Sequence, residues 1–143
     1  MDQNELIRIV QAKRESKKEM YFPTDVTGTE IYLPTEKGPI RALHYTAGPD
    51  SAPVYFDIHG GGFIMGSPEY DDGFCQNLCH QAGVHVFSID YPLAPEHPFP
   101  QDKETVSAAI RYVAEHAEQY HIDRDRMIIG GQSAGGNIAT VIA

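Results

Sequence analysis

A serine bracketed by two glycines has the spacing of an activated nucleophile. Ser133 lies in the segment Gly131-Gln132-Ser133-Ala134-Gly135, directly after the apolar run 126–130. A serine hydroxyl is a poor nucleophile that must protrude where a base can reach it, and a sharp turn from a strand into a helix presents it that way. Such a turn crowds the backbone, so a Cβ at Gly131 or Gly135 would collide with neighbouring chain. The alternative is an ordinary glycine-rich turn before a helix.

A run of three glycines could supply the donors that such a nucleophile needs. The segment His59-Gly60-Gly61-Gly62-Phe63 follows the apolar run 54–58. Without side chains, its backbone N–H groups lie bare and can hydrogen-bond the negative oxygen of a tetrahedral intermediate. The two motifs together, each after an apolar run, favour acyl transfer over two unrelated flexible loops.

With these motifs the chain resembles the hormone-sensitive-lipase-like branch of α/β-hydrolase esterases, over about residues 50 to 143. A third segment carries the resemblance as well, Asp90-Tyr91-Pro92-Leu93-Ala94-Pro95-Glu96-His97-Pro98-Phe99-Pro100. The resemblance implies that Ser133 is the nucleophile and that the N–H groups of Gly61, Gly62 and Ala134 form the oxyanion hole. The residues expected to support this site are His59, Gly60, Asp90, Tyr91, Glu96, Gln132, Gly131 and Gly135.

Two positions depart from the pattern of that branch. The branch often has an acid before the nucleophile, where this chain has Gln132, and an arginine after Tyr91, where this chain has Pro92. Gln132 keeps hydrogen-bonding capacity without the charge, and Pro92 lacks both a cation and a backbone donor. Because neither is the nucleophile, we expect tuned activity or specificity rather than a different reaction.

The histidine and the acid of a catalytic triad are absent after Ser133. In α/β-hydrolases both follow the nucleophile along the chain, but residues 134–143 contain no Asp, Glu or His, and all seven histidines precede Ser133. We expect none of them to be the general base, and we expect His59 to be structural. The sequence therefore predicts the N-terminal part of a longer hydrolase, inactive alone and truncated after the turn. The alternative is a naturally short relative that lost catalysis.

The order of apolar segments predicts an α/β fold with a mostly parallel sheet and flanking helices. Residues 1–143 then form a single partial domain, in which 1–20 are a lid-like helix and 24–143 the first part of the catalytic sheet. We expect the first two strands to be antiparallel and residues 127–129 to lie at an edge of the sheet. Asp102 is expected to be the N-cap of the helix 103–120. The expected strands are 26–33, 40–46, 54–58, 84–89 and 126–129, and the expected helices are 2–19, 74–82, 103–120 and 134–143.

Composition restricts the partners of the chain. A formal net charge of −9 and a pI of about 5.1 argue against nucleic acid and anionic membrane surfaces, which need clustered Lys and Arg. Cys75 and Cys79 are expected to be buried and reduced, and they complete no metal site with the nearby histidines. No signal peptide or membrane-spanning run is visible, which makes the cytoplasm the default compartment.

The function expected from these residues is hydrolysis of short or medium acyl esters by a serine nucleophile, with no cofactor or metal. Two alternatives remain open at this point. One is a non-catalytic small-molecule-binding relative of the same fold, and the other is an amidase or formamidase with the same turn and glycine run. The sequence also leaves open whether the chain forms a homo-oligomer.

Overall fold

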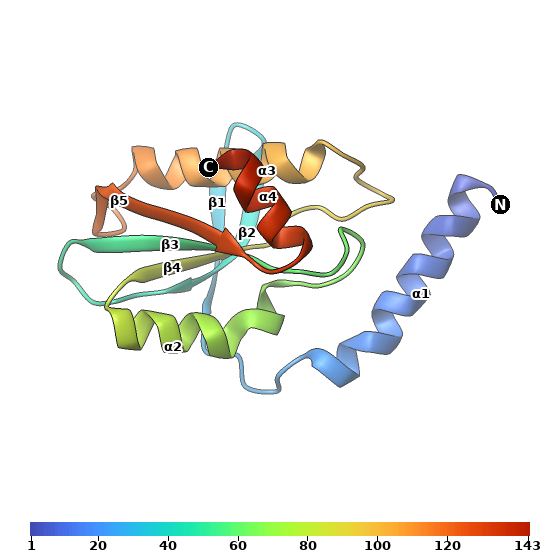
Figure 1. Cartoon of the computed structure of the whole chain (residues 1–143), viewed down its shortest axis with the longest axis horizontal. Coiled ribbons are helices and arrows are strands. Elements are labelled where there is room, and N and C mark those ends of the chain that lie inside the picture. The colour runs from blue at the N-terminus through green and yellow to red at the C-terminus, as the bar shows by residue number, and fades with distance from the viewer.

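Strands and helices alternate along the chain (Figure 1). The computed structural model describes residues 1–143, except for the side chains at positions 19 and 21. The elements are α1 (Gln3–Tyr21), β1 (Thr29–Thr35), β2 (Gly38–Tyr45), β3 (Ala52–Ile58), the 3-10 helix η1 (Pro68–Asp71), α2 (Asp72–Ala82), β4 (His85–Ile89), α3 (Gln101–Glu115), β5 (Ile122–Gly131) and α4 (Ala134–Ile142).

The strands form one five-stranded sheet in the order β1-β2-β4-β3-β5. β1 pairs with β2 and β2 with β4 in antiparallel fashion, whereas β3 pairs in parallel with both β4 and β5. The predicted α/β class and the antiparallel start of the sheet are confirmed. β5 lies at an edge of this sheet, as expected for residues 127–129. The parallel pairing places the carboxyl ends of β3 and β5 side by side.

Several predicted boundaries are wrong. β1 begins at Thr29 rather than at residue 26, because the backbone N–H groups of Thr27 and Gly28 donate to the Asp72 carboxylate instead of a strand. Asp102 is not the N-cap of α3, which is Pro100; its carboxylate accepts from the adjacent Lys103 N–H within the first turn.

The predicted ends of α3 and β5 also differ from the structure. α3 ends at Glu115, and residues 116–121 turn the chain back toward the sheet, where Ile122 N–H donates to Ala117 O at 2.8 Å. β5 starts at Ile122, four residues before the prediction, because the buried Ile122 pairs with Ala52 of β3; the charged residues 123–126 lie in a register shift before pairing resumes at Met127.

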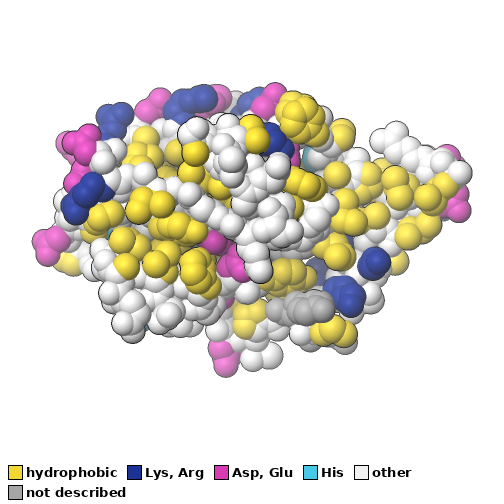
Figure 2. Space-filling view, in the orientation of Figure 1, with side chains coloured by type: hydrophobic (Ala, Val, Ile, Leu, Met, Phe, Trp, Pro, Cys, Tyr) yellow, Lys and Arg dark blue, Asp and Glu magenta, His cyan; other side chains and the backbone are white. Residues whose placement is uncertain are grey.

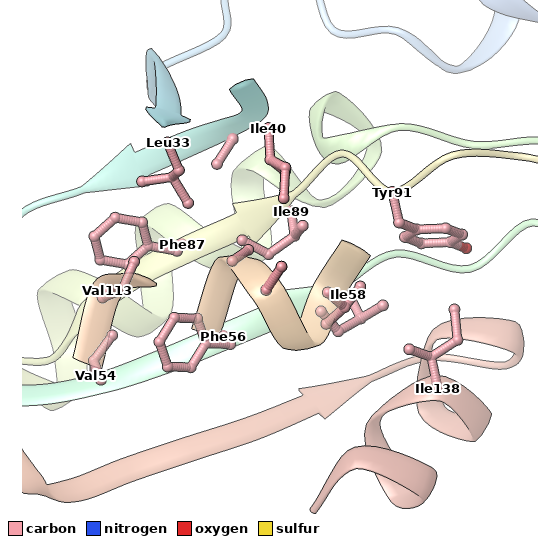
Figure 3. Close-up of a cluster of buried hydrophobic side chains, with 14 of the residues drawn as sticks. Leu33, Ile40, Val54, Phe56, Ile58, Phe87, Ile89, Tyr91, Val113 and Ile138 are labelled. Carbon is pink, nitrogen blue, oxygen red and sulfur yellow. The ribbon is translucent and has the colours of Figure 1, made fainter. Parts of the chain in front are cut away.

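The core lies on both faces of the sheet. α3 and α4 cover one face and α2 the other (Figure 1). Alternation along β3 sends Val54, Phe56 and Ile58 into the larger cluster beneath α3 and α4 (Figure 3), while Tyr55 faces α2. The smaller cluster under α2 contains Leu43, Tyr45, Cys75, Cys79 and Val86. Both cysteines are buried and free, as predicted.

The N-terminal helix α1 stands apart from this layered body (Figure 1). The predicted helix is confirmed, and Asp2 caps it by accepting from Glu5 N–H at 2.8 Å. Val10 is its one buried hydrophobic residue among those described, whereas Ile9 and Met20 are exposed. Hydrophobic side chains are also exposed on the face along which β5 runs (Figure 2), among them Ile128. No helix, within the residues described, is long and apolar enough to cross a membrane.

Burial should separate two identical substitutions. Ile89 on β4 is fully buried and Ile9 on α1 is 52% exposed. We expect Ile89→Ala to lower the free energy of unfolding by about 2–5 kcal/mol, because it leaves a cavity in the core. Ile9→Ala should change it by less than about 1 kcal/mol. Urea denaturation of both variants measures the difference, and equal losses would contradict the packing described here.

Candidate active site

A tight turn between β5 and α4 presents Ser133. Its φ of +54° and ψ of −118° lie on the side of the Ramachandran plot that L residues rarely adopt. Gly135 N–H donates to Gln132 O at 2.9 Å and Asn137 N–H donates to Ser133 O at 3.0 Å, so hydrogen bonds close the turn on both sides of the serine. Ser133 is exposed. The turn therefore has the strained strand-to-helix form of a nucleophile elbow.

Both glycines of this turn press against the end of β3. A Cβ at Gly135 would collide with the carbonyl oxygen of Ile58 and lie 2.6 Å from that of His59. A Cβ at Gly131 would also collide with Ile58 O and would lie 2.6 Å from the carbonyl carbon of Gly135. This is the crowding that the spacing of the motif predicts.

The glycine run lies directly beside the serine. A Cβ at Gly60 would be 3.6 Å from the Ser133 Cβ. Gly61 and Gly62 follow with φ of +133° and +62°, and no hydrogen bond in the described part of the chain has the amide of Gly61, Gly62 or Ala134 as its donor. Gly61 lines one cavity with Ser133, and Ala134 follows Ser133 in the chain. Bare backbone donors beside a hydroxyl are what an oxyanion hole requires.

The serine and the glycine run share a cavity. Its volume is about 450 Å³, and its lining residues are Lys17, Gly60, Gly61, Met65, Tyr70, Asp71, Gln132 and Ser133. Lys17 comes from α1, Met65 and Tyr70 from the segment after the glycine run, and Gln132 from the turn before α4. The cavity is thus built from three segments that are distant in sequence, and none of these lining residues is a histidine.

Sequence comparison adds the family to this geometry. The profile of a family described as an alpha/beta hydrolase fold matches residues 55–143. The chain belongs to the α/β-hydrolase family. It is 45% identical over 121 residues to esterase LipI of Mycobacterium tuberculosis and 39% identical over 116 residues to carboxylic ester hydrolase LipN of the same organism. The predicted resemblance is confirmed.

Solved structures agree with this family assignment. The chain superposes with a TM-score of 0.85 and 35% identity on a hyperthermophilic esterase from Pyrobaculum calidifontis, and with 0.83 and 32% on an ester hydrolase from the Lake Arreo metagenome. These matches cover 94% and 93% of this chain, but 47% and 45% of the other chains. The match to LipI covers 85% of this chain and 35% of LipI, and the match to LipN covers 80% and 31%. The chain spans about a third of the length of these curated relatives.

His59 braces the glycine run of this α/β-hydrolase from within. Its ring is fully buried and stacks on Tyr91, with ring centroids 4.3 Å apart, and the Tyr91 hydroxyl donates to His59 O at 2.8 Å. The ring Nδ1 lies 2.7 Å from Gly60 O and carries the proton there, since a carbonyl can only accept. Burial lowers the pKa of His59, so the ring is neutral. Its described contacts hold the loop against Tyr91.

The segment after β4 is held by two arginines from elsewhere in the chain. The Asp90 carboxylate accepts a hydrogen bond from Nη1 of Arg41, a residue of β2, at 3.1 Å. Arg41 thus places a guanidinium beside this segment, in which Pro92 stands where the related branch often has an arginine. Glu96 accepts from Arg14 of α1, at 2.6 and 2.9 Å. His97 does not contact Glu96 in the described contacts; its Nδ1 lies 3.1 Å from Gln101 Oε1.

Two neighbouring carboxyl groups, the buried Asp57 and the half-buried Asp71, were not predicted from the sequence to belong to the site. Asp57 of β3 is 2% exposed and accepts from the Ser88 hydroxyl at 2.7 Å. Burial, together with the neighbouring Asp71 carboxyl, raises the pKa of Asp57 to about 7, and burial also raises the pKa of Asp71. Asp71 lines the cavity with Ser133. In the sequence, the sign of this site was Asp57, a charged residue inside the otherwise apolar run 54–58.

Crowding should reverse the usual effect of a glycine substitution in a helix. Gly135 in α4 and Gly73 in α2 are both helical, so alanine should favour either helix by up to about 1 kcal/mol. A Cβ at Gly73 meets nothing within 4 Å, whereas one at Gly135 collides with β3. We expect Gly73→Ala to hold or raise the free energy of unfolding and Gly135→Ala to lower it by at least about 2 kcal/mol. Urea denaturation tests this, and a Gly135→Ala protein as stable as the parent would refute the contact.

The carboxyl pair should contribute a fall in stability as pH rises. In the unfolded chain the Asp57 carboxyl loses its proton near its ordinary value of 3.8, but in the folded protein only near 7. At this carboxyl the folded state binds more protons within that window, so Asp57 contributes a decline in the free energy of unfolding between pH 4 and pH 8. Burial lowers the pKa of His44, His59 and His85, which contributes a rise over part of the same range, so the comparison is made between variants. Asp57→Asn should remove this decline, on the order of a few kcal/mol, while Asp125→Asn at an exposed site should keep it. Urea denaturation at pH 5 and pH 8 compares the three proteins, and parallel pH profiles would contradict the assignment.

Proposed function

We propose that the protein carrying this chain is a serine carboxylic ester hydrolase that acts on short or medium acyl esters. Ser133 is its nucleophile, and the backbone N–H groups of Gly61, Gly62 and Ala134 form its oxyanion hole. The observation that carries the proposal is the contact between two motifs 70 residues apart, in which a Cβ at Gly60 would lie 3.6 Å from that of Ser133. A carbonyl carbon attacked by the serine then has its oxygen within reach of the glycine amides.

The steps follow from the geometry. The Ser133 hydroxyl loses its proton to a base and attacks the ester carbonyl, and the negative oxygen of the tetrahedral intermediate accepts hydrogen bonds from the loop and from Ala134 N–H. Ala134 is the first residue of α4, so the positive end of that helix adds to the stabilisation. The intermediate releases the alcohol, and water then releases the acid from Ser133. These steps require neither metal nor cofactor.

The general base comes from outside the 143 residues in this proposal. None of the described residues lining the cavity is a histidine, and the buried His59 is committed to Gly60 O and Tyr91. A histidine and an orienting acid contributed by further chain would complete a triad with Ser133 in the order that this fold family uses.

The relatives support the same reaction class. LipI and the Pyrobaculum protein are named esterases, and LipN is named a carboxylic ester hydrolase. The cavity of about 450 Å³ beside Ser133 falls in the size range of small-molecule sites. Lys17 brings α1 to the rim of that cavity, which gives α1 the role of a lid over the substrate.

A serine-directed fluorophosphonate probe tests the nucleophile on the full-length protein. We expect stoichiometric labelling of the parent, detected by intact-mass spectrometry, and none of Ser133→Ala. Hydrolysis of p-nitrophenyl butyrate should fall by at least about 1,000-fold in that variant, because the nucleophile is lost. Ser51→Ala, at an exposed loop position, is the matched control and should behave like the parent.

The outcomes separate the alternatives. Labelling that persists in Ser133→Ala would exclude Ser133 as the nucleophile. Tight binding of small esters by a parent protein that neither turns them over nor reacts with the probe would favour a non-catalytic binding protein. Faster turnover of matched amides or formamides than of esters would favour an amidase or formamidase.

A further inference from the structure

A single guanidinium joins α1 to two loops of the active site. Arg14 Nε donates to Ile64 O at 2.6 Å, and Nη2 donates to Ala94 O at 2.6 Å. Nη1 and Nη2 also donate to the two oxygens of the Glu96 carboxylate, at 2.6 and 2.9 Å. All three nitrogens of the side chain are therefore engaged, in the bidentate fork that arginine alone among side chains can form.

One acceptor of Arg14, Ile64 O, belongs to the loop that carries the proposed oxyanion donors. Ile64 N–H and Met65 N–H both donate to Gly61 O, at 3.2 and 2.9 Å, so the turn contacted by Arg14 is the one that orients Gly61. Ala94 N–H donates to Phe63 O at 2.9 Å, which links the second loop to the first. Arg14 thus lies two hydrogen bonds away from Gly61.

The ion pair within this cluster is persistently charged. The side chains of Arg14 and Glu96 are 21% and 23% exposed, so they are largely withdrawn from solvent. The hydrogen bonds from Arg14 lower the pKa of Glu96 to about 2, and Gln11 Nε2 donates to the same carboxylate at 3.2 Å. The pair therefore stays ionised at every pH at which an ester hydrolase would be assayed.

Few apolar side chains among those described in α1 are buried against the body. Val10 is buried, but Leu6, Ile9 and Met20 are 37%, 52% and 66% exposed. Lys17, one turn beyond Arg14 on the same side of the helix, lines the cavity that contains Ser133. Arg14 makes four of the hydrogen bonds that join the described part of α1 to the body, and Gln11 makes a fifth to the same Glu96 carboxylate.

We propose that Arg14 is a positioning residue that couples the seating of α1 over the cavity to the alignment of the oxyanion donors. When α1 is seated, Arg14 holds the turn at Ile64 and thereby Gly61; when the helix lifts, the same bonds break and the loop relaxes. The proposal rests on the proposed function. It goes further because it assigns to Arg14, a residue of the lid helix, an effect on the rate of the chemical step. A lid that controlled only substrate access would have no such effect.

The test uses steady-state kinetics of the full-length protein with p-nitrophenyl butyrate. We expect Arg14→Ala to lower kcat by at least about tenfold, because small misplacements of catalytic groups cost one to two orders of magnitude in rate. Arg14→Lys should recover only part of the loss, since an ammonium group cannot make the bidentate contact. Arg8→Ala is the matched control: Arg8 is exposed on the same helix and has no hydrogen bond or ion pair among the described side chains, and its loss should leave kcat unchanged.

A second readout does not depend on activity. The amides of Ile64 and Met65 are protected through Gly61 O, so their hydrogen exchange reports on the turn. In exchange followed by mass spectrometry, peptides covering residues 60–66 should exchange faster in Arg14→Ala than in the parent or in Arg8→Ala. Thermal unfolding of the same variants shows whether the global fold is intact.

Three results would overturn the proposal. The first is a raised KM with kcat within twofold of the parent, which would make α1 a lid independent of the oxyanion loop. The second is a loss of kcat that merely follows a loss of folded protein. The third is unchanged exchange of residues 60–66 in Arg14→Ala. A parent protein without Ser133-dependent labelling would instead refute the proposed function, and the exchange experiment would still decide the role of Arg14.

Discussion

The parallel pairing of β3 with β5 is the constraint on which the site depends. In this register Ile58 pairs with Gly131, so both strands end at the same level and their following loops leave the sheet together. Ligand sites form at the carboxyl ends of parallel strands for this reason. The close approach of Ile58 O to Gly131 and Gly135 then fixes the turn at Ser133 against the glycine run. A slip of one residue along this ladder would move the Ser133 turn away from the glycine run.

Salt bridges made by two arginines, Arg14 and Arg41, hold the loops that follow β3 and β4. Arg41 extends from β2 to Glu30 and to Asp90, and it also contacts Glu69. Arg14 of α1 likewise forms a salt bridge, with Glu96 in the segment between β4 and α3. The segment between β4 and α3 contains no regular helix or strand and four prolines, so it has few backbone donors of its own. Side chains from distant elements supply the fixation that backbone hydrogen bonds provide elsewhere.

The sequence predicted the parts of this structure whose signals are local. The strand cores, the helices and the two glycine motifs are visible because apolar runs and glycines report directly on burial and backbone freedom. The contact between the motifs could be expected only because both follow strands of a parallel sheet. Departures arose where a distant side chain decides the local structure, as when Asp72 captures the amides of Thr27 and Gly28. The early start of β5 was missed because a single buried residue, Ile122, pairs with β3 ahead of a charged stretch that interrupts the register.

The backbone angle at Ser133 has a consequence beyond the site itself. A φ of +54° is free of steric cost for glycine but costs a residue with a Cβ on the order of 1 kcal/mol. A chain shaped by folding stability alone would therefore carry glycine at this position. The serine there carries a local strain that Ser133→Gly would relieve, and the same substitution would remove the hydroxyl on which the proposed reaction depends.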